Sequence, residues 1–127
     1  MQEDFLHYLW KLKKFETLNL QTTKGEQVVI QNVGTHNYHT GPDFFNAQLI
    51  IAGQLWAGNV EIHIKSSDWY VHNHEVDPNY DNVILHVVWE HDTPIFRKDN
   101  SEIPTIQLKN YVSQVALNNY AKRKHDC

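Results

Sequence analysis

A long β-hairpin over residues 41–65 limits the possible folds of this chain more than any other stretch. Residues 45–51 are apolar and rich in strand-forming residues, Ala52-Gly53-Gln54 has the composition of a turn, and residues 55–64 return as a second strand. Side chains alternate between the two faces of a strand, so the hairpin sorts its residues by odd and even number.

The odd positions of the hairpin carry its polar side chains. A turn centred on Gly53 pairs Asp43 with His63, and it pairs Phe45 with Glu61. One face therefore carries four polar residues: Asp43, Glu61, His63 and Lys65. The other face carries apolar residues that we expect to be buried: Val60, Ile62 and Ile64. Two carboxylates held beside an imidazole and an ammonium group predict a divalent-metal site.

A purely structural interpretation of the same residues competes with this site. Glu61 and Lys65 can be solvent-facing charges of an edge hairpin, and Pro42-Asp43 has the composition of a turn. The position of Asp43 separates the two interpretations, because a metal site requires its carboxylate to lie close to that of Glu61.

The segments before the hairpin predict a helix and two strands. Residues Glu3–Phe15 have apolar side chains at helical spacing, with acids first and lysines last, as the helix dipole favours. Residues Thr17–Gln21 and Glu26–Asn32 read as strands around a Lys24-Gly25 turn.

The segments after the hairpin predict a crossover, a buried strand, a small hairpin and a closing helix. Residues Asn82–Trp89 are almost continuously apolar, as in a strand buried on both faces and parallel to its neighbour. The preceding residues suffice for a crossover, and Ser67-Asp68-Trp69 starts a short helix. A hairpin is expected from Ile95–Arg97 and Ile103–Leu108. The closing helix, Asn110–Lys124, should turn four residues inward: Val112, Val115, Ala116 and Leu117. We predict an α/β (α+β) fold with a mixed, largely antiparallel sheet and flanking terminal helices.

Composition narrows the class of protein. A chain of 127 residues predicts one domain, residues 1–127. The acidic start has no apolar signal region, no apolar run is long enough to span a membrane, and the single cysteine, Cys127, suits a reducing cytoplasm. The formal net charge of −4 does not favour nucleic-acid binding, because phosphate contacts need lysine and arginine.

Nine histidines suggest a second description of the site. His72 and His74 follow the hairpin, and His86 lies in the buried strand, so all three can approach Asp43 and Glu61. Imidazole ligands favour zinc, manganese or iron over magnesium. The alternatives are loop caps for the first two and a core histidine bonded to a backbone carbonyl for the third. His36 and His39 can reach the same rim, whereas three others are expected at the surface: His7, His91 and His125.

Four tryptophans are expected mainly in the core: Trp10, Trp56, Trp69 and Trp89. Trp69 follows the short helix start, where its ring could instead line a cleft and stack on a base.

Pro42-Asp43, 17 intervening residues and Glu61-x-His63 resemble the signature of the PD-(D/E)xK nuclease superfamily. The order of helix, meander, crossover and strand is also similar to that fold. The resemblance implies a restriction-endonuclease-like core with a metal bound by Asp43, Glu61 and His63. His63 stands where the family has lysine, and Lys65 lies two residues further along the same face.

A longer set of motifs resembles the N-terminal region of an uncharacterised bacterial family of unknown function. The motifs are Gly41-Pro42-Asp43-Phe44, Gly58-Asn59-Val60-Glu61-Ile62-His63, Ser67-Asp68-Trp69, His72-x-His74 and Val83-x-Leu85-His86-Val87-Val88. The resemblance covers essentially the whole chain. Members are typically longer, which implies that this chain is the N-terminal part of a longer protein.

Three hypotheses follow for function. The leading one is a cytoplasmic metal-dependent phosphodiesterase, a nuclease-like hydrolase acting on nucleic acid with Mg²⁺ or Mn²⁺, or with Zn²⁺. Its catalytic residues are Asp43, Glu61, His63 and Lys65, supported by His72, His74, His86 and Trp69. The second is a non-catalytic binding or structural module with a degenerate site. The third is a metal enzyme of other chemistry that uses His63, His72, His74 and His86.

Overall fold

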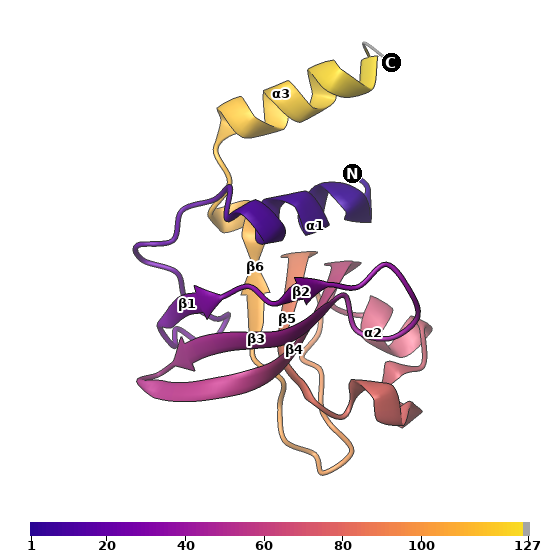
Figure 1. Ribbon diagram of the computed structural model, residues 1–127. Helices are drawn as coiled ribbons and strands as arrows, with labels where there is room; N and C mark the ends of the chain where they lie inside the picture. Colours follow the sequence, from indigo (N-terminus) through magenta and orange to yellow (C-terminus); the bar gives the residue numbers. More distant parts are fainter. Residues whose placement is uncertain (126–127) are drawn as a thin grey trace.

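One mixed β-sheet of six strands organises the chain, with a helix near each end (Figure 1). The computed structural model describes residues 1–125, and the side chains of residues 1–122. The strand order is β1-β3-β4-β5-β6, and β2 also pairs with β3. The strands are β1 (Val28–Asn32), β2 (Thr35–His36), β3 (Phe44–Ile51), β4 (Gln54–Lys65), β5 (Val83–Glu90) and β6 (Thr105–Gln107). This arrangement confirms the α+β class with a mixed sheet and terminal helices.

The expected hairpin is present as β3 and β4, but its register differs from the prediction. Ala52 and Gly53 both have positive φ, 51° and 82°, as a two-residue turn requires, so Ile51 pairs with Gln54. A bulge after Phe44 shifts the register once more, and Phe44 pairs with Val60. The expected pairing of Asp43 with His63, and of Phe45 with Glu61, is therefore wrong.

The two ends of β4 have different surroundings. Val60 and Ile62 are fully buried in the main core, and Glu61 and His63 are buried as well. At the hairpin tip Trp56 is 41% exposed, so its expected core position is wrong. The cause is strand length, because β4 pairs with β5 only from Asn59 onward and the tip has β3 as its neighbour.

The crossover and the buried strand agree with the prediction. The chain leaves β4 through α2 (Asp68–Val71) and two 3-10 turns, η1 (His74–Val76) and η2 (Pro78–Tyr80). It then enters β5, which runs parallel to β4 on one side and to β6 on the other. The first six residues of β5 are buried, as expected for a central strand.

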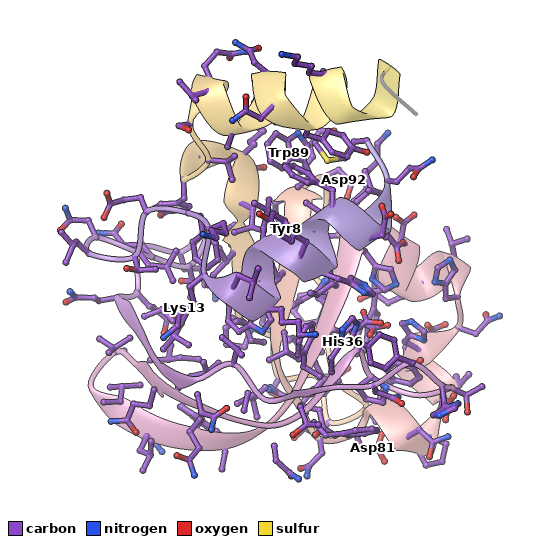
Figure 2. All side chains as sticks on the ribbon, turned by 45° about the horizontal axis from the view of Figure 1, so that its top comes forward. Tyr8, Lys13, His36, Asp81, Trp89 and Asp92 are labelled. Carbon is purple, nitrogen blue, oxygen red and sulfur yellow. The ribbon has the colours of Figure 1, made fainter. Side chains whose placement is uncertain are left out.

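The main core lies between the sheet and α1 (Glu3–Leu12). The helix contributes four buried residues: Phe5, Leu6, Leu9 and Trp10. The helix ends before the expected Phe15, because Lys13 adopts a left-handed conformation with φ of 52°. Trp89, labelled in Figure 2, is half-buried against this core.

The C-terminal helix α3 (Gln114–His125) lies over α1 (Figure 1). The rings of Phe5 and Tyr120 stack with centroids 4.0 Å apart, and Leu117 is half-buried against the core. Val115 is 68% exposed, so its expected inward position is wrong. A further turn, η3 (Leu108–Asn110), precedes the helix, which explains its later start.

Two expected strands are reduced to single bridges. Residues 17–21 contribute only the pairing of Gln21 with Gln27, and residues 95–97 only that of Phe96 with Glu102. β6 pairs with β5 instead of completing the expected small hairpin. Ile95 and Ile103 are buried in a second, smaller core cluster with Trp69 and its neighbours, so packing against the crossover replaces a longer ladder. Cys127 and the side chain of His125 lie outside the described residues.

Within residues 1–125, no helix combines the length and the apolar character that crossing a membrane requires.

Candidate metal centre

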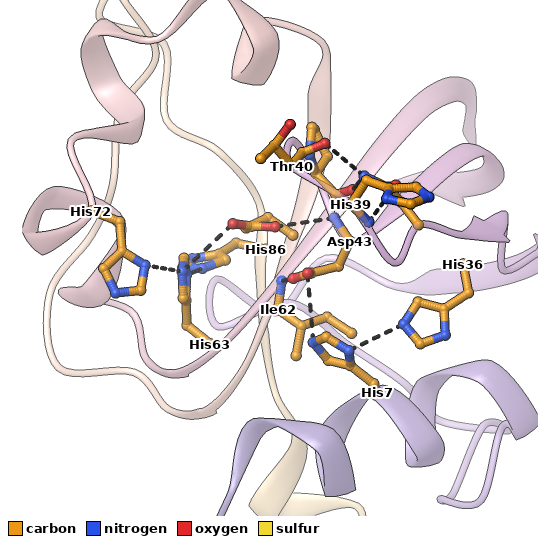
Figure 3. Close-up of polar contacts among 12 residues, drawn as sticks. His7, His36, His39, Thr40, Asp43, Ile62, His63, His72 and His86 are labelled. Carbon is orange, nitrogen blue, oxygen red and sulfur yellow. Dashed lines mark hydrogen bonds and ion pairs between the residues drawn. The ribbon is translucent and has the colours of Figure 1, made fainter.

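His63 is the centre of a histidine cluster on the face of the sheet that the crossover covers. It lies on β4 and is 2% exposed. Its Nδ1 atom lies 2.7 Å from His86 Nε2, and its Nε2 atom lies 3.2 Å from His72 Nδ1 (Figure 3). Because β4 and β5 are parallel neighbours, His63 and His86 occupy the same face of adjacent strands.

Glu61 joins this cluster from the preceding odd position of β4. Its Oε2 atom lies 3.5 Å from His63 Nε2 and 2.7 Å from His74 Nε2. The close approach to His74 is not aligned as a hydrogen bond. This ion-pair distance places the Glu61 carboxylate directly beside the His74 imidazole.

The spacing of the donor atoms fits one metal ion. Within the described residues, donor atoms of His63, His72 and His74 all lie within 4.8 Å of one another. Two ligands at about 2.0–2.1 Å from a tetrahedral zinc lie roughly 3.3 Å apart. The separations from His63 Nε2, 3.2 Å to His72 and 3.5 Å to Glu61, are close to that value. The three imidazoles can therefore approach a common cation, with Glu61 Oε2 next to two of them.

Burial keeps the central imidazoles in the form that binds metals. Burial, and next the neighbouring His86, lowers the pKa of His63 to about 2. Burial lowers the pKa of His86 to about 3, and it also lowers the pKa of His74. These imidazoles are neutral at pH 7, and a neutral imidazole is the metal-binding form.

Asp43 immediately precedes β3 and lies beside the cluster. Its Oδ2 atom accepts a hydrogen bond of 2.8 Å from the Ile62 N–H, and its own N–H donates to Glu61 Oε1 at 3.1 Å. Burial, and next Glu61, raises the pKa of Asp43 to about 8, and burial raises that of Glu61 to about 7. Without a cation the two carboxyl groups retain a proton that a divalent ion would replace.

Aromatic rings form the wall behind the histidines. Tyr80 stacks on His74 with centroids 3.7 Å apart. Trp69 meets the rings of His74 and His86 edge to face at 5.2 and 5.5 Å, and it is 2% exposed. Trp69 is therefore a packing residue of the site, and its ring is not open for stacking on a base.

His86 differs from the expected core histidine bonded to a backbone carbonyl. It is fully buried, its Nε2 atom faces His63, and its Nδ1 atom has no hydrogen-bond partner among the described residues. A ligand histidine usually has its second ring nitrogen fixed by an outer partner. His86 occupies that position relative to His63.

Lys65 stays a predicted catalytic residue, whereas the expected surface position of His7 is wrong. Lys65 is exposed, and its backbone N–H donates to Asp68 Oδ2 at 3.2 Å. His7, expected at the surface, has its Nε2 atom 3.6 Å from Asp43 Oδ1 (Figure 3). A sequence signal existed for it, because Glu3, His7 and Lys11 recur every four residues and form a polar stripe beside the apolar face of α1.

Comparison with known proteins places the chain in a family but assigns no activity. A family model described as "Protein of unknown function (DUF2851)" matches residues 3–126. This match confirms the expected relation to a family of unknown function over nearly the whole chain. No curated protein and no solved structure matches the chain.

Proposed function

The chain belongs to the DUF2851 family, and from the geometry of its histidine cluster we propose that it is a divalent-metal-dependent phosphodiesterase acting on nucleic acid. The metal ligands in this proposal are His63, His72, His74 and Glu61. The observation that carries it is the convergence of donor atoms of His63, His72 and His74 within 4.8 Å of one another, with Glu61 Oε2 3.5 Å from His63 Nε2. The neutral imidazoles can bind a cation as they are, and the carboxyl pair can release its proton when the cation binds.

The donor set favours a transition metal. Three imidazoles with one carboxylate suit Zn²⁺, Mn²⁺ or Fe²⁺, whereas Mg²⁺ prefers oxygen ligands and retains waters. Zinc or manganese is therefore the proposed ion, in place of the magnesium that two carboxylates alone would favour. When bound, such an ion lowers the pKa of a coordinated water and stabilises negative charge on a phosphate.

Asp43 is the proposed acid–base residue. It lies next to Glu61, and the Ile62 N–H fixes its Oδ2 atom at 2.8 Å. In the metal-free protein burial raises its pKa to about 8, which makes its ionised form a stronger base than an ordinary carboxylate. His63 is unsuited to that role, since its pKa of about 2 keeps it a neutral ligand.

The likeness to the PD-(D/E)xK signature supports a phosphodiester substrate. Asp43 and Glu61 lie at adjacent positions of neighbouring strands, where the Asp43 N–H donates to Glu61. The order α1, β1, β2, β3, β4, α2 and β5, with β5 parallel to β4, is similar to the order that the signature implies and supports the proposal. Histidine at position 63 distinguishes this site, because it contributes a ligand in place of the usual lysine.

A closed structural metal site is the second candidate. Four protein donors complete a tetrahedral shell, and closed shells are typical of structural zinc, whereas catalytic zinc keeps one position for water. His72 decides between the two, because it is exposed while His63 and His74 are buried. A catalytic site requires His72 to leave or to share its position with water.

Metal content and cleavage test the proposal together. Purified protein should contain zinc or manganese, or bind either one stoichiometrically, and should cleave a plasmid or an oligonucleotide in its presence. His74→Ala should lose the metal and the cleavage, whereas His39→Ala, an exposed loop histidine, should keep the metal.

Asp43→Asn should keep the metal and lose cleavage. A different result is that the protein binds metal tightly without cleaving, even when His72→Ala opens the coordination shell. That result would show that the metal site is structural. Absence of any bound metal would contradict both candidates.

A further inference from the structure

A groove opens between α1 and the loop that follows β2, on the far side of Asp43 from the histidine cluster. Its volume is about 600 Å³, within the usual range for ligand sites. Six of its lining residues carry the argument: His7, Tyr8, Lys11, His36, Tyr38 and Asp43. Tyr8 and His36, labelled in Figure 2, mark its two sides.

Three rings form a column along one wall of this groove. Phe44 is fully buried, and His36 stacks on it with centroids 4.6 Å apart and planes at 10°. The ring centre of Tyr38 lies 4.2 Å from that of His36, and the two planes are tilted by 39°. Tyr38 is 73% exposed, so the outer end of the column is accessible to a planar group. The buried inner ring holds the column in place.

One of the residues that line the groove, Lys11, places its ammonium group over this exposed ring. Lys11 Nζ lies 3.2 Å from the hydroxyl of Tyr38 and 5.9 Å from the centre of its ring. An aromatic surface with an adjacent lysine suits a nucleobase and the phosphate attached to it. The groove also contains the carboxylates of Asp4 and Asp43, so it offers no continuous basic track for a duplex.

The groove borders the proposed metal centre through Asp43, which lines the groove and contacts Glu61. His7 Nδ1 lies 3.2 Å from His36 Nε2, and His7 Nε2 lies 3.6 Å from Asp43 Oδ1 (Figure 3). The backbone of Asp43 in turn donates to Glu61, one of the proposed ligands. A nucleic-acid strand in the groove therefore passes Asp43, which lies between the groove and the proposed metal site.

We propose that this groove binds single-stranded nucleic acid, with one nucleobase stacked on Tyr38 and a neighbouring phosphate at Lys11. This inference deepens the proposed function and rests on it, since it supplies the substrate site of the same centre. The proposed nucleic acid is single-stranded because stacking on Tyr38 needs an unpaired base. One lysine also neutralises only one phosphate, whereas a duplex needs contacts to several phosphates.

Binding without metal tests the groove separately from the chemistry. A short fluorescent oligothymidylate is titrated by anisotropy into protein freed of metal with EDTA. Tyr38→Ala should weaken binding by about tenfold or more, and Tyr38→Phe should retain most of it, because stacking requires the ring and not the hydroxyl. Trp56→Ala is the matched control, since it removes another exposed aromatic ring, at the hairpin tip.

Salt dependence tests the lysine. For Lys11→Ala the slope of log affinity against log salt concentration should fall by about 0.7, the value for one phosphate on a single strand. An unchanged slope contradicts a phosphate contact at Lys11.

Two results would overturn the groove as the binding site. One is equal weakening by Tyr38→Ala and Trp56→Ala, and the other is binding of a duplex of the same sequence as tightly as the single strand. Failure of the metal centre gives a different result, because it abolishes metal content and cleavage while leaving these metal-free affinities unchanged.

Discussion

The two faces of β4 and β5 are equally buried but chemically opposite. Toward α1 the strands present side chains that are completely inaccessible: Val60, Ile62, Leu85 and Val87. Toward the crossover the alternate positions present three polar residues that are also buried: Glu61, His63 and His86. The same backbone thus supports a dry core on one side and a cluster of titratable groups on the other.

Burial has different energetic consequences on the two faces. Apolar side chains gain stability from burial without specific partners, whereas buried polar atoms are costly unless they are paired. The polar face is incompletely paired, because the Nδ1 atom of His86 and the Nε1 atom of Trp69 lack hydrogen-bond partners among the described residues. Burial also raises the pKa values of Asp43 and Glu61 and lowers that of His63, so it favours the neutral form of each side chain. We infer that the polar face is retained for what it binds.

Leu85→Ala should have the largest effect, because it opens a cavity in the apolar face. Leu85 is fully buried between α1 and the sheet, and truncations of this kind cost about 2–5 kcal/mol. The measurement is the free energy of unfolding from urea denaturation without metal. A loss below about 1 kcal/mol would mean that β5 is not central to the fold. The metal-induced gain in stability should remain intact in this variant, since it belongs to the other face.

Addition of zinc or manganese should have the next largest effect, through the polar face alone. A ligand that binds only the folded state at about 100 times its Kd adds roughly 2.7 kcal/mol. His63→Ala should remove this gain, since His63 contacts both His72 and Glu61. His91→Ala is the control, a histidine outside the cluster. A wild-type protein that gains no stability from any divalent ion would show that the polar face is structural.

His86→Leu should separate positioning from metal binding, with a smaller effect. Leucine fills a similar volume but removes the Nε2 atom that lies 2.7 Å from His63 Nδ1. Loss of an outer partner of this kind typically lowers metal affinity by about 10- to 100-fold. His86→Gln, which can restore a hydrogen bond, should recover part of that affinity. Equal affinity in all three proteins would show that His86 serves packing only.

Much of this architecture could be predicted from local patterns. Alternation in residues 60–63 gave the correct sides for Val60, Ile62, Glu61 and His63, and the apolar run gave the central parallel strand β5. Both signals are properties of single strands.

The wrong predictions concern contacts between segments that are separate in the sequence. The one-residue difference at the turn and the bulge near Phe44 moved Asp43 away from its expected partner. The only local signal of that bulge is Asn46, which adopts a left-handed conformation with φ of 59°. His7 was missed for the same reason, because only the packing of α1 on the sheet brings it to Asp43. His72, His74 and His86 were recognised as possible neighbours, but their convergence on His63 depends on the path of the crossover.

The smallest predicted effect is the pH dependence of stability in metal-free protein, and it too depends on the polar face. The pKa of Asp43 is raised to about 8 and that of Glu61 to about 7, so the folded state holds protons that the unfolded chain releases. Their stabilising contribution is complete below about pH 4 and is lost as pH rises toward 8. His63 and His86 have lowered pKa values, and their contribution grows with pH but is complete above their unfolded pKa of about 6.5.

Between about pH 7 and pH 8 the carboxyl pair should therefore dominate, and stability should fall by less than about 1.4 kcal/mol per pH unit, the limit for one proton. Thermal denaturation across this range should show a shallower slope for Asp43→Asn, which keeps an acceptor for the Ile62 N–H but cannot ionise. With bound zinc the slope should reverse, because metal binding displaces protons and strengthens as pH rises. If Asp43→Asn leaves the slope of metal-free stability against pH unchanged, the titrating group lies elsewhere. The two faces of β4 would then differ in polarity, but proton binding at the polar face would not change stability.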